Sequence, residues 1–287
     1  MKRNDYRVKP DTKVLLEKFS TSDTGRFKSK KDAKEILKEN VKKMFSLQNM
    51  LYAYNKYSLL IIFQAMDAAG KDGTIKHVMS GVNPQGTQVF SFKQPSQEEL
   101  DHDYLWRIHN HVPERGRIGI FNRSHYEEVL VVRVHDLVKN QKIPTELVSK
   151  NIWDERYREI NDFEKYLYEN GIIIIKFFLH VSKEEQKKRF LKRIDTPEKN
   201  WKFSASDIDE RKYWDKYQQA YAEAISATSK KHAPWYIIPA DHKWFMRYAV
   251  SQVIVETMED IKMSYPVLSD EQKANLESCK KQLLQEK

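Results

Sequence analysis

The chain has 287 residues, in which 50 Lys and Arg outnumber 41 Asp and Glu and give a net charge of +9. This length suits one large α/β domain or two small ones. The positive charge favours a polyanionic partner: nucleic acid, anionic lipid or a phosphate-bearing substrate. A basic surface without a specific partner is the alternative. The single cysteine excludes an internal disulfide framework, and no apolar stretch approaches the ~20 residues that span a bilayer. We therefore expect a soluble cytoplasmic protein that does not associate with membranes.

The first part of the chain is predicted to be an arm followed by a long helix. Residues 1–29 are polar and are broken by Pro10 and Gly25, so we expect them to lie on the surface or on another subunit. Apolar residues then recur at helical spacing through residues 30–56, which predicts a long amphipathic helix. This helix leads directly into the first predicted strand.

Residues 59–63 form a continuous apolar run, the pattern of a strand buried on both faces. A turn rich in small residues follows, and a helix is expected from Thr74 to about residue 82. A strand, a tight turn and a helix start make an anion site, because backbone N–H groups and the helix dipole point at one place. We predict that a phosphate is held there by Lys71 and by its neighbours Ala68, Ala69, Gly70, Asp72 and Gly73.

The loop matches the Walker A pattern G-x-x-x-x-G-K-[ST] only in part. Gly70 and Lys71 are present, but Ala65 stands in the place of the first glycine. Asp72 replaces the hydroxyl that binds magnesium, whereas Asp67 lies inside the loop and could hold Mg²⁺ from the other side. An ordinary turn after a strand is the alternative. The buried run and the acidic residue in the loop favour phosphate binding.

The next predicted strands cover residues 87–92 and 117–122, and a helix over about 96–112 separates them. The second of these strands ends in a burst of polar residues. Ligands of an open parallel sheet bind at the carboxyl ends of its strands. Asn122, Arg123 and Glu127 therefore fall where a second phosphate or a metal would be met. A capped, solvated helix start is the alternative, but an arginine directly after a buried strand is an unusual choice for a passive cap.

The rest of the chain alternates strands with helices, which indicates parallel βαβ units. The segment 129–138 follows the polar residues 122–128 directly. We expect helices over 145–169, 183–194 and 244–263 and from 206 onward, and strands over 172–179 and 235–239. Residues 266–287 are expected to form a polar helical tail.

The most concentrated positive charge lies in residues 187–202. Helical spacing predicts a basic face, with Leu191 and Ile194 anchoring the opposite side. Residues 196–204 lack any period and are expected to be a mobile loop. A basic helix and loop after a strand of a phosphate-binding domain indicate a lid over about 183–212, which closes over phosphates and supplies arginines. A solvated charged face is the alternative. The basic residues are Lys187, Lys188, Arg189, Lys192 and Arg193.

Segments spread over residues 30–265 resemble the polyphosphate kinase 2 family. They occur in the family's order and read MDAAGKDGTI (66–75), GVNPQG (81–86), FNRSHYEEVLVVRVH (121–135), KKRFLKRID (187–195) and DIDERKYWDKY (207–217). The resemblance implies an α/β P-loop kinase fold like that of thymidylate kinase, with a central parallel five-stranded sheet flanked by helices and a helical lid. It also implies phosphoryl transfer between inorganic polyphosphate and nucleotides by one domain over residues 30–265.

The resemblance and the loop argument together assign roles to the site residues. Asp67 would hold Mg²⁺, for which Mn²⁺ could be exchanged, and Lys71 would bind the transferring group. Arg123 would stabilise the oxygens of that group, and Glu127 would orient a metal or the acceptor. Asn122 resembles the subgroup that phosphorylates both AMP and ADP, since other members carry aspartate there. The two lid arginines, with the three lid lysines nearby, would line the polyphosphate path and act as arginine fingers.

The expected activity is Mg²⁺-dependent transfer from polyphosphate to AMP and ADP, forming ADP and ATP and reversible in principle. We expect a homo-oligomer, either a dimer or a tetramer. Polyphosphate is itself a polyanion and would account for the basic excess without nucleic acid. An ATP-dependent nucleotide or nucleoside kinase of the P-loop class is the main alternative, and Asp72 argues against it. A nucleic-acid-binding protein would need a further binding module or a stacking platform, and the sequence shows neither.

Overall fold

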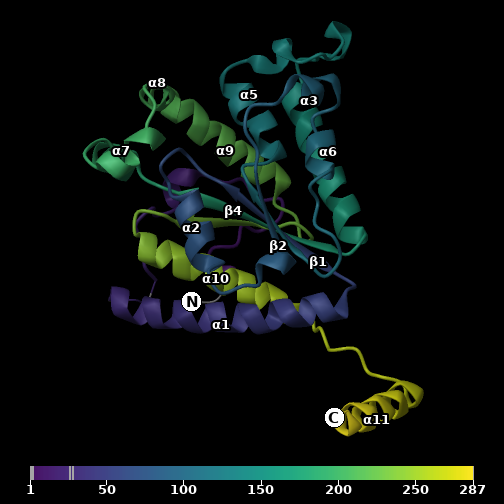
Figure 1. The fold of residues 1–287 in the computed structure, drawn as a ribbon. Coiled ribbons are helices and arrows are strands. Elements are labelled where there is room, and N and C mark those ends of the chain that lie inside the picture. The colour runs from purple at the N-terminus through teal and green to yellow at the C-terminus, as the bar shows by residue number, and fades with distance from the viewer. Residues whose placement is uncertain (1–2, 26, 28, 287) are drawn as a thin grey trace.

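The computed structural model describes residues 3–25, 27 and 29–286, and its centre is an all-parallel sheet in the order β2-β3-β1-β4-β5 (Figure 1). This arrangement confirms the predicted α/β class and its central parallel five-stranded sheet. The strands are β1 (Ser58–Gln64), β2 (Thr87–Ser91), β3 (Ile118–Asn122), β4 (Ile172–His180) and β5 (Trp235–Pro239).

Strand β1 is the middle strand, and every one of its residues is buried. Leu59 pairs with Ile118 of β3 on one side and with Ile173 of β4 on the other. Apolar side chains on both faces are required there, because helices cover both faces of a parallel sheet. Because all strands are parallel, the carboxyl ends of β1 and β3 meet at one edge. The phosphate loop and the polar burst therefore lie next to each other.

Helices cover the sheet on both faces (Figure 1). One face packs against α1 (Lys30–Tyr54), α2 (Lys71–Val78) and α10 (Lys243–Asp260). The other face packs against α5 (Val131–Val134), α6 (Ile152–Glu169) and α9 (Trp214–Thr228). The lid contains α7 (Lys183–Ile194), the 3-10 helix Pro197–Lys202 and α8 (Ser206–Glu210), so the loop expected over 196–204 is partly helical.

The single helix expected over 96–112 is wrong, because two short helices, α3 (Gln97–Asp101) and α4 (Trp106–His109), occupy this segment. The predicted capping box at Ser96 is present and starts α3. Asp103 then breaks the helix, since its carboxylate accepts a hydrogen bond from the backbone N–H of Leu105 at 2.9 Å. Such a local side-chain bond offers the backbone an alternative to helical pairing.

The helix expected from residue 145 begins at Ile152. Residues Thr145–Leu147 form a separate 3-10 turn, and the hydroxyl of Ser149 accepts a bond from the backbone N–H of Asn151 at 3.0 Å. This serine therefore stabilises a turn in front of the helix.

Most described residues of the segment 1–29 lie at the surface, as expected, but part of the segment packs into the domain. The backbone of Val8 donates to Trp235 O at 2.9 Å, and Ile237 donates to Tyr6 O at 3.0 Å, which extends the sheet beyond β5. The apolar side chains of this segment occur singly among polar ones. The sequence pattern therefore did not predict that the segment pairs with β5 like a strand. Four of its side chains are buried: Tyr6, Val8, Val14 and Leu16.

The last helix, α11 (Asp270–Gln285), confirms the expected helical tail and begins with a capping box of Ser269 and Gln272. It stands away from the rest of the molecule, and none of its residues is buried (Figure 1). Across the described part of the chain, no helix is long and apolar enough to cross a membrane.

A charged network lies inside the core, between β4, α6 and α9. The ammonium of Lys176 is fully buried and pairs with Glu164. It also donates to the Tyr126 hydroxyl and to Thr228 O, both at 2.8 Å. Burial lowers the pKa of Lys176, and the carboxylate of Glu164 opposes that shift. This network ties the segment after β3 to both flanking helices.

We expect Glu164→Ala to lower the free energy of unfolding by about 3–5 kcal/mol, because it leaves the Lys176 charge buried without a partner. Adding Lys176→Met should recover much of that loss. Glu169→Ala, which removes an exposed pair with Lys165 on the same helix, should change stability by less than about 1 kcal/mol. Urea unfolding measures all of these variants. A double variant that is no more stable than Glu164→Ala would contradict the role of the buried charge.

Candidate active site

The loop between β1 and α2 folds into two tight turns. Ala69 N donates to Met66 O at 3.2 Å, and Ala68 and Gly70 both have left-handed backbones, with φ of 58° and 108°. A Cβ on Gly70 would lie 3.3 Å from the Met246 side chain. A larger residue at position 70 would therefore be strained both by the left-handed backbone and by this close contact. Backbone that alternates into the left-handed region is typical of anion-binding nests. Helix α2 begins directly after Gly70.

Lys71 is the first residue of α2, and its ammonium returns to the loop by donating to Ala65 O at 2.9 Å. Burial lowers the pKa of Lys71, and the nearby Arg123 lowers it further. The carboxylates of Asp67 and Glu127 oppose this shift. An anion bound between Lys71 and Arg123 would be stabilised by both cations.

Arg123 connects the polar burst to the phosphate loop. Its backbone N–H donates to Phe63 O at 3.0 Å, and its φ of 65° turns the chain away from β3. The guanidinium then donates to Asp67 Oδ1 at 3.0 Å. The two side chains are 42% and 34% exposed, so a ligand can reach both. The structure thus brings Asp67, Lys71 and Arg123 together.

Asn122 contacts the start of α2. Its amide donates to Asp72 Oδ1 at 2.8 Å and to the hydroxyl of Ser91 at 3.4 Å. The carboxylate that replaces the Walker hydroxyl is therefore paired with a neutral amide. An aspartate at residue 122 would put two carboxylates within hydrogen-bonding distance.

Glu127 lies in the 3-10 helix His125–Val129 and faces the same cavity as Asp67 and Arg123. Burial raises the pKa of its carboxyl, and Arg123 and Lys71 oppose that rise. The hydroxyl of Ser124 accepts the backbone N–H of Tyr126 at 3.2 Å and fixes the start of this helix.

A cavity of about 860 Å³ opens beside these groups. Its lining combines charged groups with apolar and aromatic ones. Lid residues close it, because Ser206, Asp207 and Arg211 belong to its lining. Its apolar and aromatic wall includes Phe92, Leu100, Tyr104, Ile108, Val131 and Leu137.

The lid is fastened to the loop by Gln186, which the sequence analysis did not identify. Its amide donates to Asp67 O at 2.9 Å and accepts a bond from Arg211. Glu210 accepts a bond from the Tyr217 hydroxyl at 2.8 Å. The segment DIDERKYWDKY pointed to this region, but nothing in its spacing showed which side chains turn inward.

The predicted orientation of α7 is wrong. Leu191 and Ile194, expected to anchor it, are 51% and 44% exposed, and Arg189, expected on the basic outer face, is only 8% exposed. The Arg189 guanidinium donates to Ala69 O at 2.6 Å and to Ala240 O at 2.5 Å. Helical spacing shows which residues share a face, but the carbonyls that attract this arginine come from distant segments. Arg189 therefore holds the lid helix against the phosphate loop.

Within the described part of the chain, the other four predicted basic residues of the lid make no hydrogen bond or ion pair with the phosphate loop. Arg193 lies 3.5 Å from Asp207 and donates to Lys202 O at 2.9 Å, so its charge is used within the lid. The lysines of the predicted polyphosphate path, Lys187, Lys188 and Lys192, are exposed.

Residues 27–266 match the family described as Polyphosphate kinase 2 (PPK2). The chain belongs to this family. An ADP-polyphosphate phosphotransferase of Rhodopseudomonas palustris is 54% identical over 286 residues, which cover 99% of each chain. An AMP/ADP-polyphosphate phosphotransferase of Meiothermus ruber is 48% identical over 262 residues, 91% of this chain and 94% of the relative.

The crystal structure of Polyphosphate Kinase 2 from Arthrobacter aurescens TC1 has the same fold as this polyphosphate kinase 2 family member. The two align with a TM-score of 0.90 at 37% identity, covering 98% of this chain and 97% of that chain. The likeness therefore extends beyond the sheet to the lid and the segments that flank it.

The carboxylates of this polyphosphate kinase 2 site fit Mg²⁺. Within residues 3–25, 27 and 29–286, no group of three or more His, Cys, Asp or Glu could hold a metal ion by itself. Magnesium at phosphoryl-transfer sites is typically bound by one or two carboxylates together with phosphate oxygens and water. Asp67 and Glu127 line one cavity and would supply two oxygen ligands of such a shared site.

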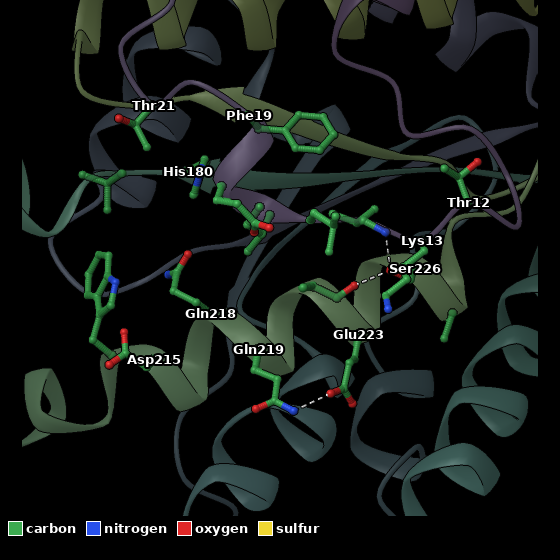
Figure 2. A pocket seen from close by; sticks show the side chains of 18 of the residues that line it. Thr12, Lys13, Phe19, Thr21, His180, Asp215, Gln218, Gln219, Glu223 and Ser226 are labelled. Atoms are coloured by element: carbon green, nitrogen blue, oxygen red, sulfur yellow. Dashed lines mark hydrogen bonds between the residues drawn. The ribbon is translucent and has the colours of Figure 1, made fainter.

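A larger groove, of about 1300 Å³, lies elsewhere on this polyphosphate kinase 2 fold (Figure 2). The N-terminal segment around Thr12 and Phe19 forms one wall, and α9 forms the other. Gln219 donates to Glu223 at 2.8 Å along the α9 wall. None of the predicted site residues lines it. Its size therefore does not mark it as the place of phosphoryl transfer.

Proposed function

We propose that this protein transfers phosphoryl groups from inorganic polyphosphate to AMP and ADP with the help of Mg²⁺. The observation that carries the proposal is the juxtaposition of Lys71, Arg123 and Asp67 beside a lid-covered cavity. The loop suits a phosphate, and the cavity is large enough for a nucleotide. The printed names of the two relatives support polyphosphate as the donor.

The chemistry requires positioning and charge neutralisation. A nucleotide phosphate oxygen is already ionised at neutral pH, so the acceptor needs no strong general base. Lys71 and the loop N–H groups hold the transferring phosphoryl group. Arg123 leaves the Asp67 carboxylate and donates instead to the phosphate oxygens, on which negative charge develops during transfer. Gln186 and Arg211 keep the lid over the cavity and exclude water, which would otherwise intercept the phosphoryl group.

Mg²⁺ held by Asp67 and Glu127 would neutralise charge on the phosphate oxygens as a Lewis acid. The raised pKa of Glu127 follows first from burial, and the cations Arg123 and Lys71 favour its charged form. A phosphate brought into this cavity therefore meets a carboxylate whose ionisation depends on the same cations.

The neutral Asn122 supports the use of both AMP and ADP. The relative from Meiothermus ruber is named for both acceptors and that from Rhodopseudomonas palustris for ADP. Asn122 pairs with Asp72 and adds no negative charge of its own beside an incoming phosphate. Two unit charges at ~4 Å repel by about 4 kcal/mol at an effective dielectric of 20. A missing carboxylate is therefore large enough to affect which phosphate is accepted.

We expect Asn122→Asp to change the ratio of AMP to ADP catalytic efficiency by about tenfold or more, equivalent to about 1.4 kcal/mol. The new carboxylate would lie against Asp72, so the double variant Asn122→Asp/Asp72→Asn is the matched control with the original charge. Initial rates on both acceptors, at saturating polyphosphate and fixed free Mg²⁺, give the ratio. Equal losses on AMP and ADP would mean that Asn122 supports catalysis without selecting the acceptor.

The expected homo-oligomer stays a prediction. Helix α11 supports it, because its apolar side chains Leu276, Leu283 and Leu284 are exposed. Light scattering of the full chain and of a chain ending at residue 266 would show whether this helix joins subunits.

A further inference from the structure

The groove between the N-terminal segment and α9 borders both ends of the lid. Ser182 and Lys183 line it where the chain enters the lid, and Trp214 and Asp215 line it where α9 begins after the lid. The N-terminal segment forms the opposite wall (Figure 2). A ligand bound in this groove would therefore contact both connections of the lid at once.

His180 presents an unused hydrogen-bonding atom to this groove. The side chain lines the groove and is only 6% exposed, and its Nδ1 is buried without a hydrogen-bond partner among the described residues. Burial lowers the pKa of the imidazole, while a hydrogen bond to the backbone of Leu16 and the charge of Asp241 oppose that shift. A carbonyl oxygen only accepts, so the neutral ring gives it the N–H and leaves Nδ1 as an acceptor.

Gln218 supplies a second polar atom without a partner. Its Nε2 is buried and forms no hydrogen bond within the described part of the chain. Figure 2 shows the side chain pointing from α9 toward His180. Its terminal amide can present its N–H groups or, after a half-turn, its oxygen. Both atoms favour a polar ligand, because an apolar one would leave them unsatisfied.

The rim of the groove is acidic, although the whole chain carries a charge of +9. Six carboxylates line it against three lysines. Asp11 pairs with Lys230, and Glu223 pairs with Arg133. The other four carboxylates are exposed and form no ion pair with a described residue: Glu17, Asp154, Glu184 and Asp215. Carboxylates of this kind around one groove attract a ligand with several positive charges.

The floor of the groove suits the methylene groups and ammonium groups of such a ligand. Val14 and Ala222 provide apolar surface. The ammonium of Lys183 lies 5.9 Å from the centroid of the Trp214 ring, so this aromatic face already attracts a cation. Tyr157 is a second aromatic residue of the lining.

We propose that this groove binds a linear aliphatic polyamine, which pairs with the carboxylates of the rim and donates an N–H to His180 Nδ1. Because the groove borders both ends of the lid, the bound polyamine restrains the lid where it joins β4 and α9. An anion does not fit, since it would face the unpaired carboxylates. This inference does not depend on the phosphoryl donor, and it adds a ligand that takes no part in transfer.

The test measures binding of spermine to the full chain by isothermal titration calorimetry, without polyphosphate or nucleotide, so that neither can sequester the amine. We expect saturable binding of one spermine per chain, which weakens as salt is added. Tetraethylene glycol, an uncharged chain of similar length, should not bind. Equal binding of spermine and the glycol, or no binding of spermine, would overturn the proposal.

Two variants locate the bound amine. Asp154→Asn/Asp215→Asn should weaken spermine binding about fivefold or more, because it removes two carboxylates from the rim. His180→Phe should weaken it about tenfold, because the acceptor of a charged donor is lost. The matched control Glu35→Gln/Glu39→Gln removes two exposed carboxylates from α1 and should bind as wild type does. Thermal unfolding identifies any variant that does not fold, and the rim variant decides the result if His180→Phe fails to fold.

Hydrogen exchange tests the effect on the lid. Spermine should slow amide exchange at residues 181–184 and 214–218 in wild type, and much less in Asp154→Asn/Asp215→Asn. Slowing at only one of these two segments would contradict a ligand that joins both ends of the lid. Equal spermine affinity of the rim variant, the α1 control and wild type would overturn the site. Binding of a lysine-rich peptide without binding of spermine would also overturn it, because the occupant would then be a protein.

Discussion

Lys71→Met is expected to reduce kcat on the order of 10³-fold or more while leaving the fold intact, because a preorganised charge is removed from the transferring phosphoryl group. The ammonium makes one bond within the loop, to Ala65 O, so little packing is lost. Lys76→Met, an exposed position on the same helix, is the matched control and should keep nearly full turnover. Steady-state kinetics and thermal unfolding of both variants measure the effect. Near-wild-type turnover of Lys71→Met would remove the phosphate loop from the mechanism.

Arg123→Asn should also reduce kcat by roughly 10³-fold, the lower range for an arginine that stabilises a transferring phosphoryl group. Asparagine is chosen because Arg123 has a φ of 65°, which asparagine tolerates better than most residues. The loss should appear in kcat more than in KM, since the charge acts mainly in the transition state.

Arg117→Gln is the matched control for this variant, because Arg117 lies beside the opposite end of β3, where it pairs with Glu114 at 3.0 Å. It should leave kcat within about twofold. A loss confined to KM in Arg123→Asn would assign Arg123 to substrate binding instead of transition-state stabilisation.

The strands could be predicted closely because buried parallel strands carry continuous apolar runs. The expected strand 59–63 is Ser58–Gln64, and the expected strand 172–179 is Ile172–His180. Helices were less predictable where a polar side chain forms a local bond. Asp103 divides one expected helix, and no periodic pattern reveals that its carboxylate binds the backbone of Leu105.

The meeting of Asp67, Lys71 and Arg123 could be predicted because a parallel sheet forces the ends of neighbouring strands together. The surroundings of Arg189 could not. Its guanidinium donates to Ala68 O and Asp241 O, which lie far from it in the chain. These distant carbonyls determine which face of α7 is buried.

The most direct test of polyphosphate as the donor is transfer of label. Purified protein is incubated with AMP, Mg²⁺ and radiolabelled long-chain polyphosphate, and nucleotides are separated by anion-exchange chromatography. A parallel reaction contains ATP in place of polyphosphate, and Lys71→Met protein serves as the control preparation. We expect label first in ADP and then in ATP, with none from Lys71→Met. Phosphorylation of AMP that occurs only with ATP would contradict the proposal and indicate an ATP-dependent nucleotide kinase.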